Sequence, residues 1–339
     1  MLVAISAGVR ISRERITFES QTYGLLYTVT PSNPTVVAGA ERERPVTPKF
    51  SASYQLTPDD LVYATAAKGF RAGGVQSQAS PVCAADLAAL NISQTPATYG
   101  SDSVWSYELG AKVRAFDQKI QLNGSVYEID WSNPQTPYTL PTCAFSYITN
   151  IGHAVSRGFD LDGTYRVTRD FTLNFSLGYT DAHYTQQVLT QPNSSTGVAL
   201  LLVPKGQPFI GVPDWNGTLG GRYDLRLSHD RRAYALVQYQ YSGRFFNSFG
   251  PGVTSYSPDV YKTPGRSYVT ARLGVVIKEV DVSLFADNIF NNDTLVPSAL
   301  GGRVSCRNTN CSIYGSYYQG ISGETYRPRT VGLTVNYAF

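Results

Sequence analysis

Hydrophobic and polar side chains alternate along most of the chain with a period of two, the pattern of β-strands that have one apolar face. The last nine residues show this most clearly, because Val331, Leu333, Val335, Tyr337 and Phe339 alternate with small or polar residues. An apolar face that ends on aromatic residues favours a strand that meets lipid over a strand of a soluble sandwich. We therefore expect an all-β, antiparallel transmembrane barrel.

The same alternation predicts about twelve strands. The predicted strands are 2–12, 49–56, 61–69, 104–114, 119–131, 155–167, 171–180, 214–225, 233–242, 269–277, 280–288 and 331–339. Residues 13–44 are predicted to form a long polar loop. Within 119–131 the alternation breaks midway, which indicates a β-bulge. Tight turns of about 2–5 residues alternate strictly with loops of about 15–30 residues, an asymmetry that outer-membrane barrels share.

The alternation also assigns side chains to the two faces of the sheet. The side chains expected on the outer, lipid-facing side are Trp105, Leu109, Phe171, Phe175, Tyr239, Leu333 and Phe339. Those expected on the concave side are Glu108, Asp162, Asn174, Arg222 and Gln238. An Arg or Lys turned to lipid would cost ~2–4 kcal/mol at the bilayer midplane, so the charged face must line a wet or plugged lumen.

Composition supports the membrane interpretation. Only 16% of the 339 residues are charged, against the roughly 25% of ordinary soluble domains, while Tyr and Phe contribute 24 and 15 residues. No apolar run approaches the ~18 residues that a membrane helix needs, so a span must be made by strands. The net charge of +3 is too small and too dispersed to indicate nucleic-acid binding.

Five segments, in order along the chain, resemble strand motifs of TonB-dependent outer-membrane receptors. They are 63–74 (YATAAKGFRAGG), 106–112 (SYELGAK), 205–206 with 212–216 (KG and VPDWN), 283–290 (SLFADNIF) and 326–339 (YRPRTVGLTVNYAF). The resemblance implies the C-terminal part of a barrel of about 22 strands, a size whose lumen is normally plugged. Residues 1–339 are then expected to be a partial receptor barrel.

The N-terminal region differs from the family pattern. Family members carry a plug domain and, before it, a short segment that TonB contacts, and residues 1–40 resemble neither. Residues 1–9 are apolar but lack the basic start of a signal peptide. We expect plug, TonB contact segment and signal peptide to be absent and the chain to be a fragment. Its sheet should be an open or poorly closed half-barrel, with 331–339 paired to 280–288.

The resemblance implies a function in the bacterial outer membrane, namely uptake of a ferric siderophore or a similar scarce, large nutrient. Outer-membrane lipid and the small-molecule ligand are the expected partners, with TonB a partner of the full-length family. A passive outer-membrane pore or adhesin-like barrel is one alternative, and a soluble β-sheet binding module is another. We expect no enzyme activity, no cofactor and no nucleic-acid partner.

The candidate ligand residues are an aromatic and basic run, 244–261, above the strand that ends near Gly243, and two further arginines on the loop side of their own strands. They are Arg71, Arg244, Phe245, Phe246, Phe249, Tyr256, Tyr261 and Arg303. Such side chains could stack on and neutralise an anionic, ring-bearing complex. The alternative is that they form an aromatic girdle and fill the loops.

All four cysteines fall in predicted extracellular loops. Cys306 and Cys311 lie close together between hydrophilic residues, which predicts a surface disulfide. The pairing of Cys83 and Cys143 stays open. The three histidines are scattered over different elements, so the sequence predicts no metal site.

Overall fold

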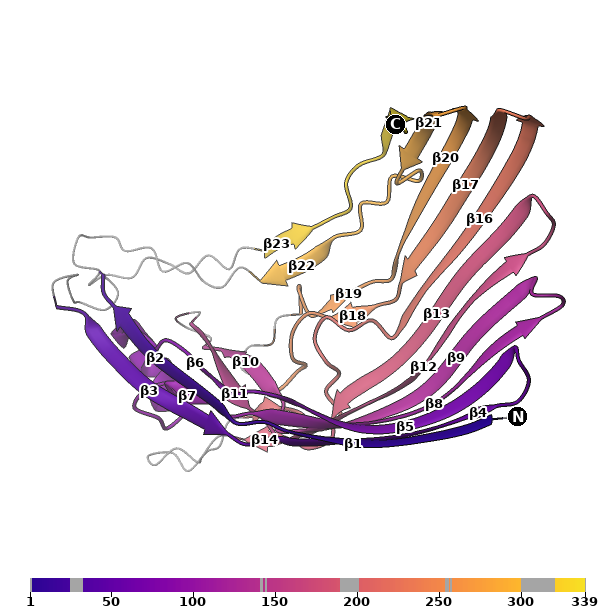
Figure 1. The fold of residues 1–339 in the computed structure, drawn as a ribbon. Coiled ribbons are helices and arrows are strands. Elements are labelled where there is room, and N and C mark those ends of the chain that lie inside the picture. Colours follow the sequence, from indigo (N-terminus) through magenta and orange to yellow (C-terminus); the bar gives the residue numbers. More distant parts are fainter. Residues whose placement is uncertain are drawn as a thin grey trace.

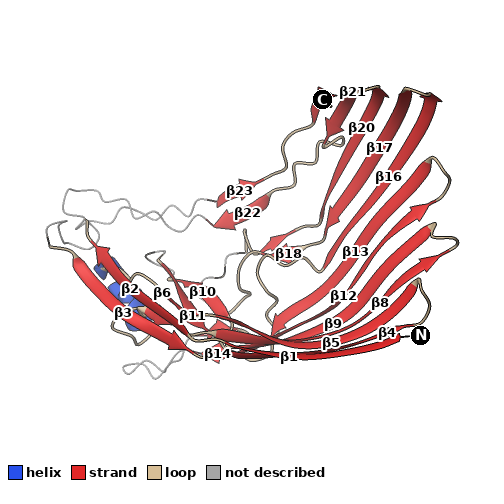
Figure 2. Cartoon of the chain, viewed as in Figure 1, coloured by secondary structure: helices blue, strands red, loops and turns tan. Residues whose placement is uncertain are grey.

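A computed structural model of the chain describes residues 2–24, 33–140, 143, 145–189, 201–253, 256, 258–299 and 321–338. Strands make up nearly all of its regular structure (Figure 2). The helical elements of the described residues are a single 3-10 turn, Pro81–Cys83, and the short helix α1, Ala84–Ala89. The all-β expectation is confirmed.

Twelve strands form one antiparallel sheet. They are β1 (Leu2–Ile11), β4 (Val46–Gln55), β5 (Asp60–Arg71), β8 (Asp102–Ala115), β9 (Ile120–Ser132), β12 (His153–Arg166), β13 (Phe171–Tyr184), β16 (Trp215–Ser228), β17 (Arg231–Ser242), β20 (Arg266–Ile277), β21 (Val280–Asp287) and β24 (Thr330–Tyr337). Each pairs with the strands before and after it in this series. The expected pairing of the terminal strand with β21 is confirmed, from Val280↔Tyr337 to Asp287↔Thr330.

The sheet is open. β1 and β24 lie at its two edges and, within the described part of the chain, do not pair with each other. Figure 1 shows the sheet curved like a trough, with these two edges far apart. The expected open half-barrel is therefore confirmed.

Short hairpins extend the sheet at its long-loop end. They are β2 (Glu14–Thr22) with β3 (Thr35–Glu43), β6 (Gly74–Val75) with β7 (Thr98–Tyr99), β10 (Gln135–Thr139) with β11 (Ser146–Asn150), β14 (Val188–Leu189) with β15 (Leu201–Val203), β18 (Phe245–Phe246) with β19 (Lys262–Thr263), and β22 (Val296–Ala299) with β23 (Ile321–Glu324). The expectation of a polar loop over 13–44 was wrong, because β2 and β3 form a regular hairpin there. A hairpin beyond the bilayer needs no apolar face, and the charged residues of this one obscure the alternation of apolar and polar positions that would indicate strands.

The expected bulge in β9 was also wrong. β8 and β9 pair in unbroken register from Ser103↔Ser132 to Ala115↔Ile120. The alternation breaks because Glu128 lies on the otherwise apolar face, where its Oε2 is 3.0 Å from Nε of Arg157. The loop end of β9 therefore extends beyond the apolar band of the sheet, and its register with β8 stays unchanged.

The register separates the two faces as the sequence predicts, because directly paired residues share a face. One face carries the exposed large apolar side chains, such as Leu109 at 57% and Leu284 at 56% exposure. The other carries Glu108 and its partner Tyr127. The register places Asp162, Asn174, Arg222 and Gln238 on that same polar face, and Trp105, Phe171, Phe175, Tyr239 and Leu333 on the apolar one. Phe339 lies outside the described residues.

Loop contacts show which face is concave. The ring of Tyr326 packs 4.8 Å from that of Tyr268, and Phe209 packs 5.5 Å from Trp131. Tyr268 and Trp131 both lie on the polar face, so the loops cover that face. The β22–β23 hairpin, which leads into Tyr326, extends over the inside of the trough in Figure 1. The polar face therefore lines the concave side, and the apolar face is convex.

Three tyrosine rings on the concave face lie over a glycine of the neighbouring strand. The pairs are Tyr63 over Gly110, Tyr127 over Gly158 and Tyr234 over Gly274. The Tyr63 hydroxyl donates to Glu108, on the same strand as Gly110, whereas the Tyr127 and Tyr234 hydroxyls reach the strand beyond the glycine, where that of Tyr234 donates to Asp281 at 3.1 Å. A Cβ at Gly274 would lie 2.3 Å from the Tyr234 ring, so this contact requires a glycine.

The buried apolar clusters lie among the loops. One contains Cys83, Leu87, Tyr138 and Tyr147 and links α1 to the β10–β11 hairpin. Cys83 forms a disulfide with Cys143, with 5.3 Å between the Cα atoms, which answers the pairing that the sequence left open. The predicted Cys306–Cys311 disulfide lies outside the described residues.

Candidate ligand site at the loop end of the sheet

Two of the arginines expected to contact ligand are already paired with carboxylates. Arg71 Nη2 lies 2.5 Å from Asp102 Oδ2, and Arg244 Nε lies 3.2 Å from Asp214 Oδ2. The guanidinium of Arg71 also lies over the ring of Trp131, 5.5 Å from its centroid. These ion pairs neutralise the charge that an anionic ligand would need. Arg303 falls outside the described residues.

Two of the expected phenylalanines are packed inside the loops. Phe245 is 8% exposed and Phe249 is 4% exposed. Phe249 belongs to a buried cluster with Ile151 and Tyr184 that covers the loop end of the concave face. These two side chains therefore fill the interior of the loops, as the alternative to ligand binding expected.

The other expected aromatic residues, Phe246, Tyr256 and Tyr261, lie beside Lys262, which the sequence analysis did not single out, and we call these four residues the loop cluster. The Phe246 and Tyr261 ring centroids are 5.0 Å apart, and those of Tyr256 and Tyr261 are 5.3 Å apart. Pairing of β18 with β19 sets Lys262 opposite Phe246, and its Nζ lies 5.6 Å from the ring centroid. Burial, and secondarily Tyr256, raises the pKa of the Tyr261 hydroxyl above its ordinary value.

A second group, the strand-end cluster, consists of Arg266, Tyr268 and Tyr326. The Arg266 guanidinium lies 4.8 Å from the centroid of the Tyr326 ring, which also packs on Tyr268. The Arg266 Nε is buried and has no hydrogen-bond partner among the described residues. Sequence reasoning missed this cluster, because Tyr326 meets Arg266 only after the chain returns from its last long loop.

The two clusters give this region its charge. Within the described residues, neither Lys262 nor Arg266 takes part in an ion pair. Each instead lies against an aromatic ring within the ~6 Å that a cation–π interaction allows. Two available cations beside tilted and edge-on aromatic rings can bind an anionic ligand that itself carries rings or conjugated groups.

A hollow of about 370 Å³ lies further along the concave face, towards the short turns. Its lining includes Arg222, Tyr234, Arg272, Phe285 and Asp287. The guanidinium of Arg272 lies 5.7 Å from the centroid of the Phe285 ring. Polar and charged side chains thus continue from the ligand clusters along the inside of the trough.

The described residues offer little for other chemistries. No group of three or more His, Cys, Asp or Glu side chains among them is placed to hold a metal ion. None of their helices is both long and apolar enough to cross a membrane. The predicted absence of a resident metal or cofactor stays a prediction.

A curved antiparallel sheet with an apolar convex face, a charged concave face and loops sorted by length defines an outer-membrane β-barrel. The family model "TonB dependent receptor-like, beta-barrel" matches residues 3–291, and the chain belongs to this family. Its members are outer-membrane receptors and transporters of Gram-negative bacteria, so the chain is an outer-membrane protein. The alternative of a soluble binding module was therefore wrong.

Several known proteins are similar to the chain. The metal-pseudopaline receptor CntO of Pseudomonas aeruginosa is 26% identical over 206 residues, which are 59% of this chain and 24% of that protein. The ferric yersiniabactin uptake receptor FyuA from Yersinia pestis superposes with a TM-score of 0.69 at 16% identity, over 99% of this chain and 43% of that one. For the copper transporter OprC the TM-score is 0.66 at 14% identity, over 99% and 47%. The chain thus spans less than half of these proteins.

Proposed function

We propose that the chain supplies part of the membrane span and part of the ligand site of a receptor that imports a ferric siderophore or a similar anionic metal complex. Family membership and the similarity to receptors for metal-pseudopaline and ferric yersiniabactin support this proposal. TonB would drive import in the complete receptor, as in the family. The observation that carries the proposal is the pair of cations, Lys262 and Arg266, held beside aromatic rings and without acidic partners in the described part of the chain.

The chemistry of the ligand follows from these groups. Metal complexes of organic chelators present negatively charged oxygens around a core that often contains flat rings. Lys262 and Arg266 would neutralise the oxygens, and the half-buried rings of Phe246 and Tyr261 would contact the rings of the ligand. Arg71 and Arg244, already paired with aspartates, would instead hold the surrounding loops in place.

Titration of the purified, detergent-folded chain with an anionic ferric tris-catecholate complex tests the proposal. Binding is followed by quenching of the intrinsic aromatic fluorescence. We expect Lys262→Gln and Arg266→Gln each to weaken binding about tenfold, or ~1.4 kcal/mol, because each removes one charge-assisted contact. Arg169→Gln is the matched control, since Arg169 lies in the turn between β12 and β13 at the opposite end of the strands. Tight binding that neither variant weakens would overturn the assignment of these residues, and transfer of the complex across vesicles without saturation would favour a passive pore.

A further inference from the structure

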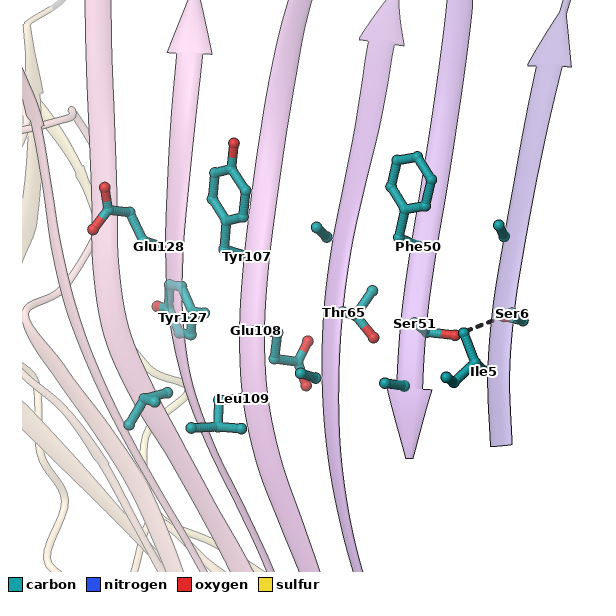
Figure 3. Close-up of a pocket in the computed structure, with 15 residues that line it drawn as sticks. Ile5, Ser6, Phe50, Ser51, Thr65, Tyr107, Glu108, Leu109, Tyr127 and Glu128 are labelled. Carbon is teal, nitrogen blue, oxygen red and sulfur yellow. Dashed lines mark hydrogen bonds between the residues drawn. The ribbon is translucent and has the colours of Figure 1, made fainter. Parts of the chain in front are cut away.

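The convex face has a shallow apolar groove of about 710 Å³ across β1, β4, β5, β8 and β9. Figure 3 shows Phe50 and Tyr107 standing on either side of β5, with Leu109 and Ile5 in the neighbouring row. Between these larger residues, the groove is lined by the small side chains of Ala64 and Ala66.

The register explains why the groove follows β5. Ala66 pairs with Phe50 on one side and Tyr107 on the other, so a methyl group separates two rings. In the next row, Ala64 pairs with Ala52 and Leu109. Because side chains on one face recur every two residues, the two alanines form a continuous low track along the strand.

Lys68 lies at the loop end of this track. It is two residues beyond Ala66, on the same face, and pairs directly with Trp105. The Trp105 and Tyr107 rings are stacked, with 6.0 Å between centroids, and aromatic residues of this kind mark the bilayer interface. Among the described residues Lys68 belongs to no ion pair, whereas its acidic neighbour Glu128 is bound by Arg157. Asp130 lies beyond Trp105, on the side away from Lys68.

We propose that this groove binds one anionic, phosphate-bearing membrane lipid, with an acyl chain over Ala64 and Ala66 and a phosphate on Lys68. An apolar track that ends in a single cation at the aromatic belt matches a lipid that has an apolar tail and a negative headgroup. The convex face meets lipid in this family of membrane barrels, so lipid molecules surround the groove. The site lies on the opposite side of the sheet from the ligand clusters and is independent of the proposed uptake function.

Native mass spectrometry of the full chain, folded in micelles that contain either phosphatidylglycerol or phosphatidylcholine, measures lipid occupancy. Lys68→Gln should lower phosphatidylglycerol retention about fivefold, which corresponds to the ~1 kcal/mol of one basic residue near a membrane surface. It should leave phosphatidylcholine retention unchanged. Ala66→Leu fills the track and should lower retention of both lipids.

Two matched variants serve as controls. Lys112→Gln removes the same charge from the concave face, and Ala111→Leu adds the same bulk to the convex face outside the groove. Both should retain phosphatidylglycerol like the parent chain, and circular dichroism should show equal strand content in all four variants. The proposal is overturned if Lys68→Gln retains phosphatidylglycerol fully or if Lys112→Gln loses as much. Equal retention by Ala66→Leu and Ala111→Leu would overturn the placement of the acyl chain.

Discussion

The contact between Tyr234 and Gly274 makes a quantitative prediction about the stability of the sheet. Gly274→Ala would place a methyl carbon 2.3 Å from the Tyr234 ring, closer than any real contact, so the ring must move. Movement of the ring breaks the hydrogen bond that the Tyr234 hydroxyl donates to Asp281 at 3.1 Å. It also disturbs the stacking of the Arg222 guanidinium, which lies 4.8 Å from the ring centroid.

The magnitude follows from these two losses. Overpacking costs about 1–3 kcal/mol and a lost hydrogen bond to a charged acceptor about 1.5–3 kcal/mol. The displaced ring relieves part of the overlap, so the two terms do not add in full. We expect Gly274→Ala to lower the free energy of unfolding by about 2–4 kcal/mol.

Urea unfolding of the micelle-bound chain measures this difference. Gly220→Ala is the matched control, because Gly220 lies on the same face and its nearest neighbouring atom would be 3.8 Å from the new Cβ. In a Tyr234→Ala background, Gly274→Ala should cost little, since no ring remains to be displaced. Losses for Gly274→Ala and Gly220→Ala that agree within about 0.5 kcal/mol would refute the reasoning.

Three further outcomes are expected. Leu219→Arg on the convex face should cost about 2–4 kcal/mol in thermal unfolding from lipid vesicles, whereas Gln238→Arg on the concave face should be tolerated. Cys83→Ser opens the disulfide to Cys143, which closes 60 residues, and should lower local stability by about 2–4 kcal/mol, seen as faster limited proteolysis. Burial raises the pKa of Tyr147 from 10.0 to about 12. The stabilising contribution of the neutral Tyr147 hydroxyl is therefore complete below pH 10.0 and is lost as pH rises through about 12. Between these pH values the stability of Tyr147→Phe against denaturation should depend less on pH than that of the parent chain.

The strands were predictable from sequence where they cross the bilayer, and less so beyond it. The prediction of 171–180 stopped short of β13, which continues to Tyr184. Past the apolar band, Asp181 and His183 occupy the convex face and pair at 3.0 Å between Oδ1 and Nδ1. Water accepts polar side chains on both faces of a strand, so the period-two signal disappears there although the strand continues.

The ligand site was harder to predict because its charges depend on register. Arg71 and Arg244 stand among aromatic residues in the sequence, but Asp102 and Asp214 reach them from distant positions in the chain. The sequence shows which residues are basic but does not show which of them pair with a carboxylate in the folded chain. Only the pairing of strands distinguishes these arginines from Arg266, whose Nε lacks a partner among the described residues.

The order of strands in the sheet bears on how the binding surface can diversify. Every strand pairs with the next sheet strand along the chain, so the sheet can assemble one hairpin at a time. The entropic cost of closing a loop rises only by about 0.6 kcal/mol for each doubling of its length. Insertions and deletions between β17 and β20, where the loop cluster lies, would therefore hardly affect assembly of the membrane-spanning strands. Such a scaffold lets natural selection change the residues that the loops present while the strands keep their sequence pattern.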